Sequence, residues 1–221
     1  MFATFELRLV KNGETVGTGI FLSKDDKVYL VTATHVSKST NQSSYIIVCD
    51  KSNNPILRDL NKLNKTLNWI NHSIEDISAL EIDVSSNFDI LNGRCFPYEQ
   101  IEFDVAKISR DDELTSVGFP NGLGAFGKFS PFTFRSYVSS SEITLNRADI
   151  NKPALFICLE NPSVGGYSGC PIFDLGIMKK GVMTSSQGPT RLIGIMHGTL
   201  SDNTGGKIAV FSPALYLKDL I

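Results

Sequence analysis

Ser168 lies in a short stretch whose residue types could support nucleophilic catalysis. It stands between glycines in the run Val164–Pro171, VGGYSGCP. Small neighbours expose a serine Oγ and let a substrate carbonyl approach the backbone N–H groups beside it. A Gly-x-Ser-Gly string is weak evidence alone, because glycine and serine are also common in surface turns. The stretch therefore predicts a hydrolytic nucleophile only if a base and a carboxylate occur elsewhere in the chain.

Two earlier segments contain a candidate base and a candidate carboxylate. His35 follows an apolar, strand-like run that starts at Val28, which predicts an imidazole at a strand end, facing a cleft. Asp76 opens a second apolar run, and a buried aspartate needs a hydrogen-bond partner such as an imidazole N–H. Singly, such a histidine is more often a half-buried polar residue and such an aspartate a turn former. His72 is the competing base, but its polar surroundings predict a surface residue.

The order His35, Asp76, Ser168 resembles that of the trypsin-like, chymotrypsin-fold serine peptidases, in their bacterial HtrA-like and glutamyl-endopeptidase-like branch without zymogen activation. Three further stretches carry the resemblance: Gly17–Leu22, Ser116–Gly124 and Leu192–Ile195. The resemblance implies an all-β fold of two antiparallel six-stranded β-barrels with a short C-terminal helix. Residues 1–105 would form the barrel with His35 and Asp76. Residues 106–221 would form the barrel with Ser168 and the wall of the substrate cleft.

The resemblance also implies a role for each matching residue. Ser168 would attack the scissile carbonyl, His35 would accept its proton and return it to the leaving amine, and Asp76 would hold the imidazole tautomer. The backbone N–H groups of Gly166 and Ser168 would form the oxyanion hole. No cofactor and no metal is expected.

Two residues beside Ser168 depart from the family pattern. Tyr167 stands where zymogen-activated relatives keep an aspartate for a freed amine, and no Ile-Val activation site is present. We therefore expect an enzyme that folds active without cleavage. Cys170 replaces a second glycine, and its side chain is expected to pack inward rather than act as a second nucleophile.

His197 has two interpretations. Some relatives have Gly-x-His in this strand to read an acidic or amide side chain, whereas here Gly194 and His197 are one residue further apart. A one-residue shift turns a strand side chain to the opposite face. Without a bulge, His197 would face Asp76, and Met196 would line the specificity pocket. The substrate-binding candidates are Ile195, Met196, His197 and Gly198, with the peptide docking as an added strand along Leu192–Met196.

Short alternating runs separated by turns predict strands in most of the chain. A helical face is predicted over Leu57–Ile70, a helix after Ser212–Pro213, an insertion over Lys51–Ser73, and the connection between barrels at Ser109–Glu113. The glycine-rich stretches Asn121–Lys128 and Thr199–Lys207 are expected to be loops around the cleft. The predicted strands are Thr15–Leu22, Val28–Thr32, Tyr45–Cys49, Ile77–Ile82, Leu114–Phe119, Phe132–Val138, Ala154–Leu159, Pro171–Phe173 and Arg191–Met196.

Composition narrows the class of protein. The 221 residues carry a formal charge of −2 from 21 basic and 23 acidic side chains, which predicts neither a nucleic-acid nor a membrane partner. Met1–Arg8 alternates charged and apolar residues, so no signal peptide is expected. The four cysteines form no Cys-x-x-Cys pair, which favours reduced thiols in a cytoplasmic protein over disulfides.

The sequence therefore predicts a cytoplasmic serine endopeptidase that uses a His-Asp-Ser triad and an acyl-enzyme intermediate on a protein or peptide substrate. The alternative is a non-catalytic peptide-binding module on the same scaffold, against which the complete triad argues. An esterase is a weaker third possibility, since the same chemistry would serve it. The oligomeric state is left open.

Overall fold

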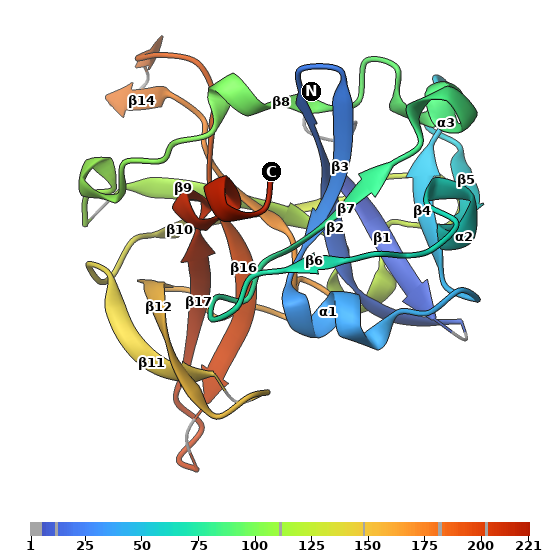
Figure 1. Cartoon of the computed structure of the whole chain (residues 1–221). Helices are drawn as coiled ribbons and strands as arrows, with labels where there is room; N and C mark the ends of the chain where they lie inside the picture. The colour runs from blue at the N-terminus through green and yellow to red at the C-terminus, as the bar shows by residue number, and fades with distance from the viewer. Residues whose placement is uncertain (1–5, 12, 111, 148, 181–182, 202) are drawn as a thin grey trace.

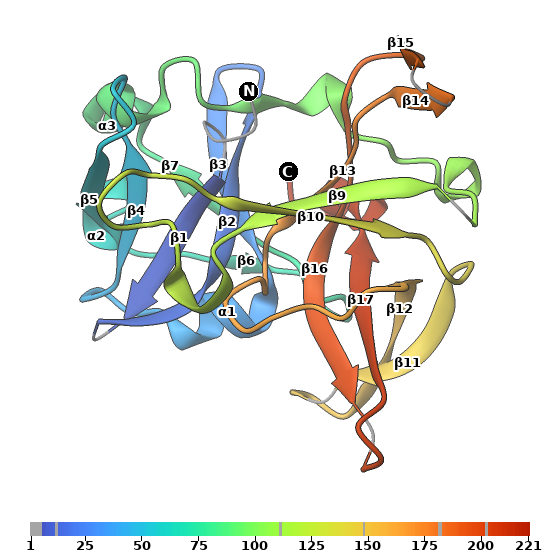
Figure 2. The same ribbon diagram turned by 180° about the vertical axis from the view of Figure 1, so that it is seen from behind.

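The polypeptide forms two sheets that lie side by side (Figures 1 and 2). The structure is a computed structural model, and it describes residues 6–11, 13–110, 112–147, 149–180, 183–201 and 203–221. Of the stretch Met1–Arg8, residues 1–5 lie outside the described part, and the first strand begins at Glu6. No helix among the described residues is both long and apolar enough to cross a membrane.

The first sheet is built from the N-terminal half of the chain. Its order is β5-β4-β1-β2-β3-β7-β6, all antiparallel, with the short β8 added parallel to β2. The apolar run from Val28 becomes β3, which is buried because it pairs centrally with both β2 and β7. The strands are β1 (Glu6–Lys11), β2 (Glu14–Lys24), β3 (Lys27–Thr32), β4 (Tyr45–Cys49), β5 (Pro55–Asp59), β6 (Ile70–Asn71), β7 (Ser78–Ile82) and β8 (Phe96–Pro97).

The second sheet follows in the order β10-β9-β13-β16-β17-β12-β11. The sheet curls so that strands near its opposite edges meet. Ser139 N–H donates to Cys158 O at 2.9 Å, and Glu160 N–H donates to Tyr137 O at 3.0 Å. The end of β10 therefore lies against β12. The strands are β9 (Glu113–Gly118), β10 (Phe132–Tyr137), β11 (Ile143–Arg147), β12 (Lys152–Leu159), β13 (Pro171–Asp174), β16 (Arg191–Ser201) and β17 (Lys207–Pro213).

The remaining elements are short. A separate hairpin of β14 (Ile177–Lys180) and β15 (Met183–Ser186) stands away from both sheets in Figures 1 and 2. The helices are α1 (Thr34–Ser39), α2 (Leu60–Leu63), α3 (Val84–Leu91) and the 3-10 turns Tyr98–Gln100, Val105–Lys107, Pro120–Gly122 and Ala214–Asp219.

A shared core joins the two sheets. Ile20 and Val31 of the first sheet pack in one buried cluster with Phe173 and Ile195 of the second. Leu217 of the last 3-10 helix, drawn red in Figure 1, completes this cluster where the sheets meet. Burying apolar surface contributes about 25 cal/mol per Å², so exposing this cluster would cost free energy. The shared core therefore opposes separation of the two halves.

The all-β fold and all nine predicted strands are confirmed, to within a few residues at their ends. The sheets contain eight and seven strands rather than six each. The helix predicted over Leu57–Ile70 is wrong: the stretch contains the end of β5, the four-residue α2, and a turn in which Leu67 has a φ of +47°. The predicted C-terminal helix is present as a 3-10 helix. In the stretch Thr199–Lys207, residues 199–201 are the end of β16, 203–206 form the turn after it and Lys207 begins β17, while residue 202 lies outside the described part.

Candidate active site

The loop that contains the predicted nucleophile Ser168, residues 164–170 and called the nucleophile loop below, is held in a shape that only glycine permits at two positions. Gly166 has a φ of +90°, and a Cβ there would lie 2.4 Å from the carbonyl oxygen of Phe119. Gly169 has a φ of +82°, and its Cβ would lie 2.1 Å from Thr32 Oγ1. Residues that carry a Cβ rarely adopt these backbone angles, and a Cβ at either position would collide with the neighbouring atom. The two glycines therefore fix the turn that presents Ser168.

Two side chains of this loop anchor it within the second sheet. Tyr167 is fully buried, and its hydroxyl donates to Phe132 O at 2.8 Å. Burial raises the pKa of this Tyr167 hydroxyl, so it remains a donor at all ordinary pH values. Cys170 packs inward among the buried residues beneath the loop, as expected. None of the four cysteines, all of which are described, forms a disulfide.

The loop also rests on the first sheet, although its residues belong to the second half of the chain. Thr18 of β2 donates its backbone N–H to Ser168 O at 2.8 Å and its hydroxyl to Gly166 O at 2.8 Å. Thr32 Oγ1 in turn donates to Thr18 O at 2.7 Å. β2 and β3 thus set the position of the loop relative to any group carried by the first sheet.

His35 is positioned by the first sheet and lies in α1, not at the strand end that the sequence predicts. Its ring Nδ1 lies 2.7 Å from Asp76 Oδ2, and its backbone N–H donates to Asp76 Oδ1 at 3.1 Å. Nδ1–H donation to a carboxylate leaves Nε2 with a lone pair, as a general base requires. Its side chain is 30% exposed, so the ring is accessible from solvent.

Asp76 is fully buried and receives two further donors from the second sheet. His197 Nδ1 lies 2.5 Å from Oδ2, and Arg147 Nη2 lies 3.0 Å from Oδ1. Burial alone would raise the pKa of Asp76, but hydrogen bonds from His197 and His35 together with their charges lower it well below its usual value. Asp76 is therefore a carboxylate throughout the working pH range.

Ser168 lies beside this cluster and is hydrogen-bonded to His197, not to His35, among the described residues. Its Oγ–H donates to the backbone carbonyl of His197 at 3.2 Å. The two imidazole rings stand edge to face with centroids 5.4 Å apart. In unliganded hydrolases the nucleophile–base hydrogen bond is often long and forms only with substrate present. His35 is thus hydrogen-bonded directly to Asp76, whereas Ser168 is connected to Asp76 only through His197, whose carbonyl accepts from Ser168 and whose ring contacts Asp76.

The expected oxyanion donors are available. Within the described part of the chain, the N–H groups of Gly166 and Ser168 have no hydrogen-bond partner, whereas those of Tyr167, Gly169 and Cys170 are all bonded. Unpaired backbone N–H groups in a constrained turn are suited to bind a developing oxyanion.

His35, Asp76 and His197 are the described residues whose ligand atoms come close enough to suggest a metal site, all within 4.8 Å of one another. Two ligands at about 2.1 Å on a tetrahedral zinc ion lie about 3.4 Å apart. Here both Nδ1–Oδ2 separations, 2.7 and 2.5 Å, are shorter than that and match charge-assisted hydrogen bonds. The spacing fits a carboxylate hydrogen-bonded by two imidazoles better than a metal centre.

The prediction that a peptide docks along Leu192–Met196 is wrong. That part of β16 is paired on both sides, with β13 at Leu192 to Ile195 and with β17 at Gly194 to Met196. A strand can be added only at an unpaired edge. Beyond Met196, the described residues of β16 pair with β17 alone, so the open edge runs over 197–201.

The substrate-binding candidates divide accordingly. Ile195 and Met196 are buried in the core, so Met196 does not line an open pocket. A register shift lies between Met196 and Gly198, and the ring of His197 turns to Asp76. Gly198 adjoins the nucleophile, since a Cβ there would lie 3.8 Å from Ser168 Oγ.

Sequence reasoning also misplaced His72 and did not single out two other residues near Asp76. His72 is not a surface residue: its side chain is 10% exposed, it accepts the N–H of Glu75, and it pairs with Asp219 at 3.1 Å. Arg147 and Glu75 were not singled out, yet both are buried beside Asp76. A lone arginine or glutamate in a polar stretch gives no sequence signal of such a role.

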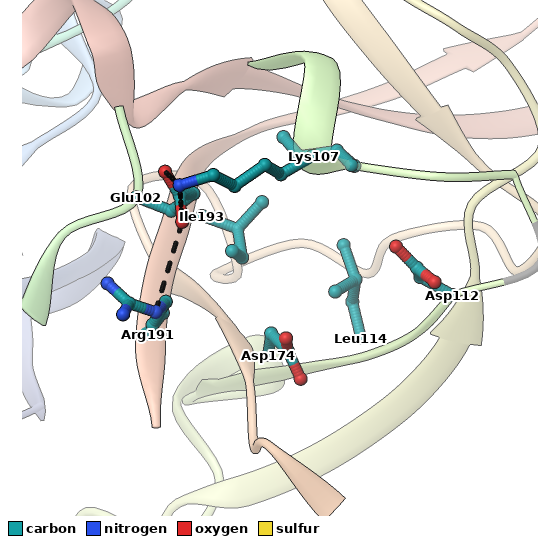
Figure 3. A pocket seen from close by; sticks show the side chains of 8 residues that line it. Glu102, Lys107, Asp112, Leu114, Asp174, Arg191 and Ile193 are labelled. Carbon is teal, nitrogen blue, oxygen red and sulfur yellow. Dashed lines mark hydrogen bonds and ion pairs between the residues drawn. The ribbon is translucent and has the colours of Figure 1, made fainter. Parts of the chain in front are cut away.

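A separate pocket of about 210 Å³ lies at the ends of β9, β13 and β16 (Figure 3). Its cations, Lys107 and Arg191, are both paired with Glu102, and Asp112 and Asp174 lie on the other side. Ser168, His35 and Asp76 do not line it.

Comparisons with known proteins agree with this geometry. Residues 17–176 match the family model of the trypsin-like peptidase domain. No curated protein matches the sequence. The MamO protease domain of Magnetospirillum magneticum shares the fold at 12% identity and a TM-score of 0.62, covering 99% of this chain and 96% of that one.

Two other solved structures share the fold. The HtrA-type protease AlgW, solved with a tripeptide, is 20% identical with a TM-score of 0.60 over 98% of this chain, which spans 58% of the AlgW chain. Rv3671c from M. tuberculosis H37Rv, in an inactive mutant form, is 14% identical with a TM-score of 0.60 over 99% of this chain and 85% of that one. The family match shows that the protein is a serine endopeptidase that belongs to the trypsin-like peptidase domain family.

Proposed function

We propose that Ser168, His35 and Asp76 hydrolyse peptide bonds through an acyl-enzyme. Ser168 Oγ attacks the scissile carbonyl while His35 Nε2 takes its proton, and the imidazolium then gives that proton to the leaving amine. Water, deprotonated by His35, releases the acyl group in the second half of the reaction. The observation that carries this proposal is the 2.7 Å contact of His35 Nδ1 with the buried Asp76 carboxylate, beside a serine loop seated on the same sheet.

In this proposal, the Ser168–His197 hydrogen bond belongs to the enzyme without substrate. The carbonyl of His197 lies at the start of the open edge of β16, where an added strand would place a backbone N–H. A substrate N–H that takes this carbonyl displaces Ser168 Oγ. The freed hydroxyl then turns to His35, so substrate docking completes the catalytic arrangement.

The oxyanion of the tetrahedral intermediate would be bound by the N–H groups of Gly166 and Ser168. Both donors are unpaired among the described residues, and the loop is fixed before substrate arrives, so little reorganisation is required. One such donor typically lowers the barrier by about 3 kcal/mol.

The substrate would be an extended peptide segment that adds to the open edge at 197–201. Backbone hydrogen bonds would supply affinity, and side chains on alternate positions would supply specificity. Thr199 Oγ1 donates to Ser163 O at 2.9 Å, which ties this edge to the segment that precedes the nucleophile loop. This bond fixes the edge relative to the nucleophile loop before a peptide adds to it.

Substitution of Ser168 tests the proposal directly. Ser168→Ala should abolish both covalent labelling by a fluorophosphonate probe and cleavage of a denatured-proteome peptide library, while the exposed Ser43→Ala should retain both. Persistent labelling of Ser168→Ala would identify another nucleophile. A wild type that reacts with the probe and simple esters but cleaves no peptide would support the esterase alternative. A wild type that binds peptides without labelling or cleavage would support the binding module.

A further inference from the structure

Arg147 is a fully buried arginine next to the catalytic carboxylate. It lies at the end of β11, and its side chain is 1% exposed. Nη2 contacts Asp76 Oδ1 at 3.0 Å and Asp149 Oδ2 at 2.6 Å, Nε donates to Asp149 Oδ1 at 3.0 Å, and Nη1 donates to Ile74 O at 2.5 Å. One guanidinium thus bonds two carboxylates and one carbonyl.

These contacts belong to a larger junction between the sheets. We call residues 72–76, which precede β7 of the first sheet, the docking segment. Besides Ile74 and Asp76, this segment uses Glu75, whose carboxylate accepts the backbone N–H of Leu155 in β12 at 3.1 Å. At its other end His72 pairs with Asp219 near the C-terminus. Four of its five residues therefore bond to the second half of the chain.

Burying a guanidinium costs several kcal/mol unless its charge is compensated and its donors are satisfied. Asp149 and Asp76 together compensate it and leave one net negative charge. That remaining charge is available to stabilise an imidazolium on His35 during the reaction. The guanidinium is itself fixed in orientation by its two bonds to Asp149, and its Nη2 bond to Oδ1 therefore restricts rotation of the Asp76 carboxylate, which a freely rotating ammonium would not do.

Rotation of this carboxylate matters because two imidazoles share Oδ2. His197 Nδ1 and His35 Nδ1 both contact that oxygen, at 2.5 and 2.7 Å. A carboxylate released from Arg147 could turn toward His197 and lengthen its bond to His35. With Oδ1 held by Arg147 together with the backbone N–H of His35, Oδ2 stays within reach of both rings.

We infer that Arg147 is a positioning residue for the reaction: from the second sheet, which carries Ser168, it holds Asp76 of the first sheet in the orientation that serves His35. The inference rests on the proposed roles of the triad. Arg147 does not touch the substrate edge, so its effect falls on the chemical step and not on substrate binding.

The experiment compares the full chain with Arg147→Met, Arg147→Lys, Arg147→Ala and a control, Arg135→Met, which removes an exposed arginine of β10. We expect Arg147→Met to lower kcat about 10- to 100-fold with KM within about twofold. Arg147→Lys keeps the charge but cannot bond three acceptors in a plane, so its kcat should fall about tenfold. Arg135→Met should match the wild type. Added methylguanidinium should restore part of the activity of Arg147→Ala, and should not affect Arg135→Met.

A second readout needs no turnover. The Nδ1–H protons that bond Asp76 give low-field proton resonances, and these should shift or broaden in Arg147→Lys but not in Arg135→Met. If Arg147→Met does not fold, Arg147→Lys decides by kcat and by the spectrum. A folded Arg147 variant with wild-type kcat or an unchanged low-field spectrum overturns the inference. An inactive wild type whose spectrum changes in Arg147→Lys would refute the proposed function while supporting the positioning role.

Discussion

Replacing the proposed catalytic carboxylate by its amide, Asp76→Asn, should inactivate the enzyme and destabilise the junction of the sheets. The carboxylate accepts four donors, two on each oxygen: His35 N–H and Arg147 on Oδ1, His35 Nδ1 and His197 Nδ1 on Oδ2. An amide keeps one oxygen and replaces the other with an NH₂ donor. In either orientation this NH₂ faces donors in a buried site.

The two orientations have different costs. With NH₂ toward Arg147, a buried guanidinium loses a charged partner, which typically costs about 3–5 kcal/mol. With NH₂ toward the rings, both imidazoles must accept on Nδ1 and carry their proton on Nε2, so His35 no longer has a lone pair for Ser168. The amide of a triad carboxylate lowers kcat about 10⁴-fold in such sites, equivalent to about 5 kcal/mol of barrier.

The assay is steady-state cleavage of a peptide found by library profiling, combined with thermal unfolding. We expect kcat of Asp76→Asn to fall about 10⁴-fold, KM to stay within about threefold because Asp76 is buried away from substrate, and the free energy of unfolding to fall by about 3 kcal/mol. The control Asp89→Asn removes an exposed carboxylate, which pairs with Arg58. A folded Asp76→Asn with kcat within threefold of wild type would refute the reasoning.

Three other substitutions follow from the site. Burial raises the pKa of Glu75 above 4.5, only partly offset by the Leu155 N–H bond, so its contribution to folding is full below pH 4.5 and declines as pH rises through the raised pKa. Glu75→Gln should remove this decline, and its unfolding free energy relative to wild type should increase from pH 4 to pH 8 in denaturant titrations. Gly166→Ala places a Cβ 2.4 Å from Phe119 O and moves an oxyanion donor, so kcat should fall at least 10²-fold in the same peptide assay. Thr18→Val removes the hydroxyl that bonds Gly166 O and accepts Phe119 N–H, which should cost about 1–3 kcal/mol in thermal unfolding.

Each of these has a clear contrary result. A parallel pH dependence for Glu75→Gln and wild type would show that Glu75 titrates normally in the folded state. Unchanged turnover in Gly166→Ala would mean that the oxyanion is held elsewhere, and an unchanged melting temperature in Thr18→Val would remove the proposed seat of the nucleophile loop.

The strands were predictable because their cause is local. Alternating or continuous apolar runs such as Val28–Thr32 and Leu114–Phe119 are long enough to identify strands, and burial in the sheet follows from them. The helix predicted over Leu57–Ile70 is absent because leucine spacing alone does not distinguish a helix from a folded loop. Its leucine spacing suits a helical face, but Leu60 and Leu63 are buried beside the first sheet and the chain then turns.

The candidate site was predictable only in part. Ser168, His35 and Asp76 occur in recognisable local contexts, whereas the open edge of β16 depends on which strands flank it, a property of the tertiary structure alone. Arg147 is a further case: its role arises from contacts with residues far away in the chain, and nothing in its immediate sequence distinguishes it from an exposed arginine.

The seating of the nucleophile loop on Thr18 of β2 has a consequence for the intact enzyme. Since the proposed nucleophile Ser168 and its base His35 are carried by different sheets, a slight separation of the halves should misalign them before either half loses its own core. The rate of peptide cleavage should then fall when the two halves separate only slightly. As the urea concentration rises, cleavage of a peptide substrate by the enzyme should stop while circular dichroism still shows native strand content. A peptide bound at the edge of β16 should shift this loss of activity to higher urea concentration.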